Sequence, residues 1–83
     1  MTPAPDFLRL REEQYAYVYG LLLDLTQEAS AATRLTDETF SNVYRAWYAR
    51  ARNPDLDLQV WLEAVARNNY RNYRKSQSHR SAE

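Results

Sequence analysis

Helix breakers are scarce in this chain, and their positions constrain its fold more than any other feature. It contains one glycine and three prolines in 83 residues, and Pro3 and Pro5 lie at the extreme N-terminus. Only Pro54 can interrupt the remainder, because proline lacks a backbone donor and disfavours the helical conformation of the preceding residue. Alternating strand patterns are absent, and alanine, leucine, glutamate and arginine dominate. The sequence therefore predicts an all-α fold.

Apolar residues recur at spacings of three and four in three segments, which is the period of an amphipathic helix. They predict helices over residues 6–29, 33–52 and 57–75, within one domain that covers residues 1–75. Residues 76–83 are polar and are expected to form a disordered tail. The expected architecture is a small bundle of three main helices.

Residues that accept backbone hydrogen bonds stand near each predicted helix start. Asp6 is expected to cap the first helix, Ser30 or Thr33 the second, and Asp57 the third. Gly20 lies within the first helix, where it weakens the helix by about 1 kcal/mol relative to alanine. Its missing side chain would let a second helix pack closely.

The inward faces of the second and third helices each contain a tryptophan. Leu35, Thr39, Val43 and Trp47 recur every four residues in the second helix. The inward stripe of the third helix consists of Leu58, Trp61, Leu62, Val65, Asn69 and Tyr73. We therefore predict that both tryptophans are core residues rather than wedges inserted between DNA bases.

The composition argues against several kinds of chemistry. There is no cysteine, which excludes disulfides and thiol chemistry, and the single histidine, His79, lies in the polar tail. Neither a transition-metal site nor a Ser/His/Asp triad can be assembled from these residues. We expect no enzymatic activity and no cofactor. The longest apolar run is far shorter than a membrane span, which favours a soluble cytoplasmic protein.

The formal charge is zero but unevenly distributed. Residues 1–66 contain six basic and ten acidic side chains, a net charge of −4. Residues 67–83 contain five basic and one acidic side chain, a net charge of +4. Such asymmetry is typical of a chain with an anionic partner on one side. By itself a basic cluster favours a solvated helix end over a binding site, because cations near a helix C-terminus interact favourably with the helix dipole.

Three segments, in order, resemble region 2 of the bacterial sigma factors, in the extracytoplasmic-function (ECF) group of the sigma-70 family. VYGLLLDLTQE, residues 18–28, is similar to the end of region 2.1. RLTDETFSNVYRAW, residues 34–47, resembles region 2.2, and WLEAVARNNYRNYRK, residues 61–75, resembles region 2.4. The separation between the first two motifs also agrees with the family. The resemblance implies a sigma region 2-like fold and a role in transcription initiation at the bacterial nucleoid.

The resemblance also implies two binding surfaces. Region 2.2 of such sigma factors docks on the clamp helices of the largest RNA polymerase subunit, and the matching or neighbouring positions are Leu35, Asp37, Glu38, Phe40, Asn42 and Arg45. The last helix and the loop before it recognise and open the −10 promoter element. The corresponding DNA-binding residues are Asn53, Asp55, Arg67, Asn68, Arg71, Asn72, Arg74 and Lys75. Arginine and lysine would neutralise phosphates, and asparagine would contact base edges.

Several positions depart from the family pattern, and two alternatives follow. Arg34 and Asp37 replace an acidic residue and a glutamine of region 2.2, and Asn72 replaces the aspartate of region 2.4. The sequence given contains no region 4, so we expect either an excised region 2 or a natural one-domain relative, and a separate chain could supply region 4. The chain could instead be a sigma mimic that binds polymerase or an anti-sigma factor without melting DNA. A helical interaction domain with an incidental resemblance is the third reading.

Overall fold

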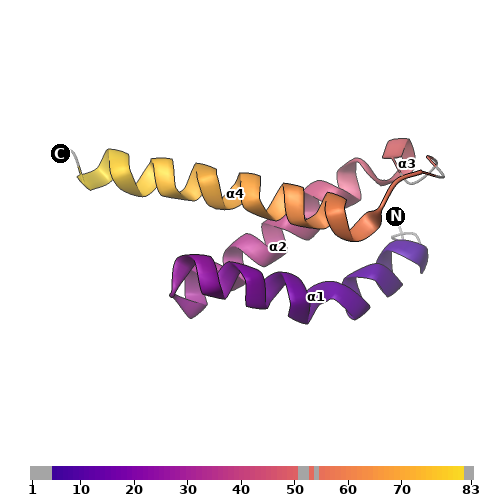
Figure 1. The fold of residues 1–83 in the computed structure, drawn as a ribbon, viewed down its shortest axis with the longest axis horizontal. Coiled ribbons are helices and arrows are strands. Elements are labelled where there is room, and N and C mark those ends of the chain that lie inside the picture. The colour runs from indigo at the N-terminus through magenta and orange to yellow at the C-terminus, as the bar shows by residue number, and fades with distance from the viewer. Residues whose placement is uncertain (1–4, 51–52, 54, 82–83) are drawn as a thin grey trace.

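The computed structural model describes residues 5–50, 53 and 55–81, and within these residues it contains helices and no strand. Figure 1 shows three long helices, α1 (Pro5–Thr26), α2 (Ala29–Arg45) and α4 (Leu58–Ser81), and one short helix, α3 (Trp47–Arg50). Each long helix contacts the other two. The predicted all-α bundle of three main helices is confirmed.

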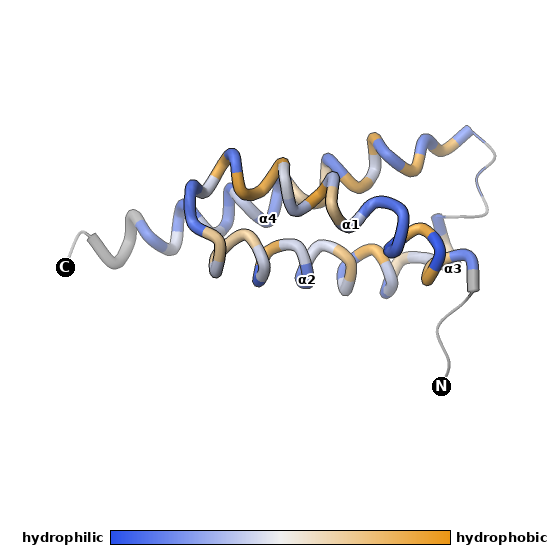
Figure 2. Tube along the Cα trace, turned by 90° about the horizontal axis from the view of Figure 1, so that it is seen from below, coloured by the Kyte–Doolittle hydropathy of each residue, from blue (hydrophilic) through white to orange (hydrophobic). Residues whose placement is uncertain are grey.

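The three long helices form a bundle in which α2 runs opposite to α1 and α4 (Figure 1). The molecule measures 44 × 27 × 21 Å. A helix rises about 1.5 Å per residue, so the 24 residues of α4 are long enough to extend past its neighbours. Its C-terminal turns project beyond α1 and α2 in Figure 1, and the part of them that is coloured in Figure 2 is largely hydrophilic.

The link between α1 and α2 is shorter than predicted. Helix α1 ends at Thr26, and Gln27 has a positive φ of 58°, which reverses the chain within two residues. The Thr26 hydroxyl donates to the carbonyl of Leu22 and accepts the backbone N–H of Glu28. This tight turn starts α2 at Ala29 rather than at residue 33.

Neither residue predicted to cap α2 does so. Glu28 occupies the N-cap position in an extended conformation and makes no side-chain capping bond. The Ser30 hydroxyl donates to the Glu28 carboxylate, and the Thr33 hydroxyl donates to the Ala29 carbonyl. Both lie inside α2, where a hydroxyl bonds to nearby groups of its own helix instead of to the free N–H groups of the first turn. Asp6 lies inside the first turn of α1, because that helix already includes Pro5.

The helix predicted over residues 33–52 is interrupted at Ala46. The Ala46 N–H contacts the carbonyls of both Asn42 and Val43 at the end of α2, and the four residues of α3 follow. Trp47, directly after the break, packs against Phe7 and Trp61 with ring centroids 5.6 and 6.2 Å apart. We attribute the interruption to this aromatic packing, since no glycine or proline is present there. Residues 51–52 lie outside the described residues.

Helix α4 begins where the sequence predicts and continues further. The Asp57 carboxylate accepts the backbone N–H groups of Gln59 and Val60 at 3.0 and 3.2 Å, so its predicted role as N-cap is confirmed. The helix continues to Ser81, through the segment predicted as a disordered tail. No glycine or proline follows Pro54, and lysine, glutamine and arginine favour helix.

The core is apolar and draws on all four helices. Its buried members are Phe7, Leu10, Val18, Leu22, Ala32, Leu35, Phe40, Val43, Trp47, Trp61, Leu62 and Ala66. Trp47 and Trp61 are each 7% exposed, which confirms their prediction as core residues. The close helix packing expected at Gly20 is wrong, because a Cβ atom there would meet nothing within 4 Å.

Candidate functional site

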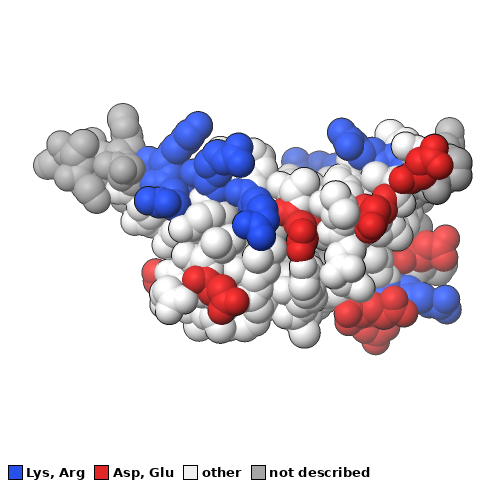
Figure 3. All heavy atoms as spheres, viewed as in Figure 1, with Lys and Arg blue, Asp and Glu red and all other residues white. Residues whose placement is uncertain are grey.

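The exposed face of α4 contains a group of cations interleaved with amides. Arg67, Asn68, Arg71, Asn72, Arg74 and Lys75 are all exposed, as a binding role requires. Figure 3 shows Lys and Arg gathered over the second half of α4, whereas most Asp and Glu visible in that view lie nearer the other end. The structure therefore presents these six predicted DNA-binding residues together.

The four cations of α4 lie on its solvent-exposed side. Asn68 and Asn72 border a hollow shared with α2, and Lys75 follows Asn72 by three residues, whereas Arg71 follows Arg67 by four. Arg67 is close enough to Tyr17 of α1 to influence its phenol. Arg74 follows Arg67 by two helical turns and so shares that side.

Two adjoining hollows form a groove between α2 and α4, with volumes of about 590 and 320 Å³. Glu38 from α2 and Asn69 and Asn72 from α4 belong to both hollows. Asn42 and Asn68 border the larger one. We call this the α2–α4 groove. Its walls present one carboxylate and several amides to solvent.

A buried amide fixes the relation of α2 to α4 beneath the groove. Asn69 is 6% exposed, and its amide nitrogen donates to the Thr39 hydroxyl at 3.3 Å and to the Asn42 carbonyl oxygen at 3.0 Å. The Thr39 hydroxyl donates its own hydrogen to the Leu35 carbonyl, so it can only accept from Asn69. The Asn42 side chain is thereby oriented, and its amide nitrogen has no partner among the described residues.

Guanidinium groups lie over aromatic rings at both ends of the α2–α4 groove. The Arg34 guanidinium lies 5.7 Å from the ring centroid of Tyr73, and that of Arg50 lies 6.0 Å from the Trp61 ring. Within the part of the chain that the structure describes, Arg11–Asp37 is the only ion pair. Neither Arg34 nor Arg50 is therefore neutralised by a described carboxylate.

Two of the residues predicted to contact polymerase are buried. Leu35 and Phe40 are each 2% exposed and belong to the core, so little of either side chain is available to a partner. Both project inward because α2 buries a wide apolar face against α1 and α4, and this overrides the role implied by the resemblance.

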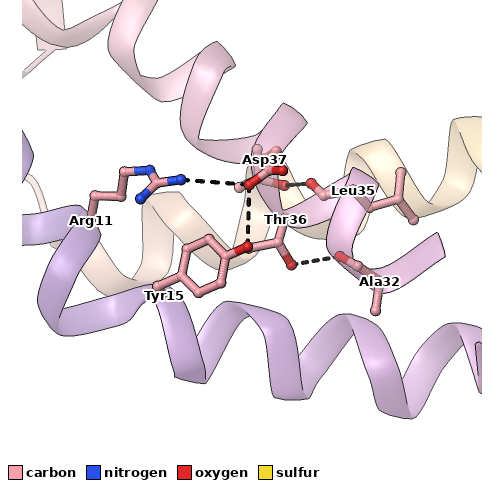
Figure 4. Close-up of polar contacts among 7 residues, drawn as sticks. Arg11, Tyr15, Ala32, Leu35, Thr36 and Asp37 are labelled. Atoms are coloured by element: carbon pink, nitrogen blue, oxygen red, sulfur yellow. Dashed lines mark hydrogen bonds and ion pairs between the residues drawn. The ribbon is translucent and has the colours of Figure 1, made fainter. Parts of the chain in front are cut away.

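Asp37 is engaged in a contact between α1 and α2. It accepts a hydrogen bond from the Tyr15 hydroxyl at 3.2 Å and pairs with Arg11 at 3.6 Å (Figure 4). Burial, followed by the negative charge of Asp37, raises the pKa of the Tyr15 phenol. Arg11, Asp37 and Arg45 border a separate hollow between α1 and α2. The predicted polymerase surface is therefore divided, with Asp37 and Arg45 on the α1 side and Glu38 and Asn42 in the α2–α4 groove.

The loop predicted to contact DNA is not adjacent to the cations of α4. Asn53 and Asp55 are exposed, and the Asn53 side chain accepts the Asp55 N–H at 3.0 Å, which stabilises a local turn. The loop precedes the first turn of α4, and Lys75 lies 17 residues beyond Leu58. At about 1.5 Å per residue, the start of α4 lies roughly 14 Å along the helix from Arg67 and roughly 25 Å from Lys75.

Sequence reasoning did not include Arg34, Arg50 or Asn69 in the candidate site. A polar residue on the inward stripe, such as Asn69, is a signal for a buried hydrogen-bond partner. Its partners Thr39 and Asn42 are distant in sequence, so the signal could not identify them. For the two arginines nothing in the local sequence indicates stacking on a ring from another helix.

The remaining features bear on broad classes of function. Over the described ranges, no cluster of three or more His, Cys, Asp or Glu side chains is arranged to hold a metal ion. Among the described helices, none combines the length and the apolar character needed to cross a membrane. Comparison with protein-family models, curated proteins and solved structures finds no match for this chain.

Proposed function

We propose that this chain is a sigma region 2-like domain of the ECF type, which binds core RNA polymerase and recognises the −10 promoter element. The observation that carries the proposal is the exposed face of α4, where Asn68 and Asn72 alternate with Arg71 and Lys75. Cations bind phosphates without regard to sequence, and amides distinguish base edges. A surface with both kinds of group side by side suits a protein that reads DNA.

The proposed polymerase contact is the outer side of α2 next to α1. Arg45 is exposed there, and Asp37 is held by Tyr15 and Arg11. Leu35 and Phe40 support this surface indirectly, because they pack α2 against the core. The clamp helices of the largest polymerase subunit would meet charged side chains on this surface, so the contact should weaken as salt increases.

The alternative function is a sigma mimic that binds polymerase or an anti-sigma factor without melting DNA. The separation between Asn53 and Asp55 and the cations of α4 favours it, because the two parts of the predicted DNA site are not joined. A module of this kind would use the same α2 surface and leave α4 solvated.

Capture of core polymerase by the tagged chain, with and without a labelled −10 single strand, tests the proposal. Arg45→Glu should reduce capture about tenfold or more, since it reverses the charge of a side chain in the proposed interface. Arg9→Glu makes the same charge change at an exposed position of α1 and serves as the matched control. Equal capture by the wild type and Arg45→Glu, with unchanged circular dichroism, would reject the assigned surface. Polymerase capture without retention of the labelled strand would favour the mimic.

A further inference from the structure

The hollow between α1 and α2 combines two arginines and one carboxylate with a floor of aromatic rings. It has a volume of about 500 Å³, and Arg11, Asp37 and Arg45 border it. Phe7 and Phe40 line its floor and are almost fully buried. We call it the α1–α2 hollow. An anionic group placed over this apolar floor would be partly shielded from water, which strengthens its attraction to the two cations.

We infer that the α1–α2 hollow binds a carboxylate of a protein partner between Arg11 and Arg45, and that Asp37 competes with that carboxylate from within the chain. The inference rests on the proposed function only in taking polymerase as the partner. The resemblance implies that Asp37 contacts polymerase directly. Here Asp37 instead occupies, in the free chain, the guanidinium that the partner's carboxylate would take.

Asp37 holds Arg11 only loosely. The Arg11 Nη2 and Asp37 Oδ1 atoms are 3.6 Å apart, and the two side chains are 45% and 55% exposed. An exposed ion pair of this kind contributes little to stability, so a second carboxylate can replace Asp37 at small cost. Asp37 also accepts a hydrogen bond from the Tyr15 hydroxyl at 3.2 Å (Figure 4) and keeps that partner when Arg11 turns away.

Aromatic rings hold the Arg11 guanidinium in place independently of Asp37. It lies 5.0 Å from the ring centroid of Tyr15 and 5.9 Å from that of Phe40. These two rings stack on each other with their centroids 5.9 Å apart. A cation–π contact uses the face of the guanidinium and leaves the N–H groups at its edge able to donate. Arg11 therefore stays positioned for a new acceptor.

Ser41 and Arg45 supply the other donors of the site. Ser41 lies one helical turn from Asp37 and one turn from Arg45, so the three residues share one side of α2. Ser41 and Arg45 are exposed, and among the described side chains no carboxylate pairs with Arg45. A carboxylate above Ser41 would meet one guanidinium from α1, one from α2 and a hydroxyl between them. Charge-assisted hydrogen bonds of this kind are stronger than those between neutral groups.

Binding of an acidic peptide to the full chain, measured by fluorescence anisotropy, tests the inference. The probe is a blocked, dye-labelled helical peptide of alanine, leucine and glutamate, and its counterpart has glutamine in place of glutamate. The glutamate peptide should bind about tenfold more tightly than the glutamine peptide. Arg11→Gln and Arg45→Gln should each weaken its binding about tenfold. Arg9→Gln makes the same charge change on α1 outside the hollow and should weaken it less than about threefold.

Removal of the competing carboxylate gives the distinguishing result. Asp37→Asn should strengthen binding of the glutamate peptide about fivefold, and the asparagine oxygen can still accept from Tyr15. The matched control Glu13→Gln removes one charge from an exposed position of α1 outside the hollow and should change binding less than about twofold. Both positions are exposed, so the fold should survive, which circular dichroism can check. Equal gains for the two variants, or weaker binding by Asp37→Asn, would overturn the inference.

Capture of core polymerase by the same variants distinguishes this inference from the proposed function. If Asp37→Asn captures less polymerase than the wild type, Asp37 contacts the partner directly and the inference is wrong, whereas the proposed function stands. If the peptides bind in the expected order but the wild type captures no polymerase, the proposed function is wrong and the carboxylate site stands.

Discussion

Asn69 should contribute to stability through two hydrogen bonds that can be measured separately. It donates to Thr39 at 3.3 Å and to Asn42 at 3.0 Å from a buried position on α4. A typical internal hydrogen bond contributes about 1 kcal/mol, so Asn69→Ala should lower the free energy of unfolding by about 2 kcal/mol. Asn42→Ala removes one of the two bonds and should cost about 1 kcal/mol.

The loss of unfolding free energy in Asn69→Ala should not exceed this value, because the two groups that accept hydrogen bonds from Asn69 keep other partners. Without Asn69, the Thr39 hydroxyl still donates to the Leu35 carbonyl at 2.8 Å. Asn42 is only half-buried, so water can reach its side chain. Neither group would be left as an unsatisfied buried polar atom, which would add about 1–3 kcal/mol.

Urea unfolding followed by circular dichroism at 222 nm gives the four free energies of a double-mutant cycle. The coupling between Asn42 and Asn69 should be about 1 kcal/mol. Asn72→Ala, three residues further along α4 and exposed, deletes the same amide and should change stability by less than about 0.5 kcal/mol. A coupling near zero would falsify the argument that this bond fixes α2 against α4.

Three further changes test the core, the first helix and the α1–α2 contact. Gly20→Ala should raise the melting temperature by about 4–8 °C, since alanine favours the helix by about 1 kcal/mol and its Cβ meets no neighbour; an unchanged melting temperature would show that this stretch is not a stable helix. Trp61→Ala should cost about 3–5 kcal/mol in a urea titration, because the ring is buried against Trp47; wild-type stability would show an exposed ring. The pKa of Tyr15 is raised above 10.0 by burial and by Asp37, so the unfolded chain loses this proton at a lower pH than the folded chain. Stability should therefore fall as the pH rises past 10, and Tyr15→Phe should fall less steeply in thermal melts across that range.

Features set by local chemistry were predictable from sequence. Asp57 fixes the start of α4, because its carboxylate caps the first turn of that helix. The four-residue spacing of Leu35, Thr39, Val43 and Trp47 placed all four on the buried side of the second helical segment. That spacing already conflicted with the partner-binding role implied for Leu35, and burial resolved the conflict in favour of the spacing.

Features set by distant contacts were not predictable. The break at Ala46 accompanies the packing of Trp47 on Phe7 of α1 and Trp61 of α4, which are distant from each other in sequence. The early start of α2 depends on a left-handed Gln27, a conformation that glutamine rarely adopts. The α2–α4 groove likewise depends on which helix faces which, and helical periodicity gives the inward face of a helix but not its neighbour.

The uneven distribution of charge along the chain should orient the molecule in an electric field. With net charges of −4 and +4 on its two segments, it carries a large electric dipole although its total charge is zero. A polyanion would turn the molecule before contact, so that the C-terminal half of α4 arrives first and encounters are faster at low ionic strength. The same asymmetry should retain the chain on a cation-exchange resin near its isoelectric point of about 6.6, where a protein with evenly mixed charges would pass through.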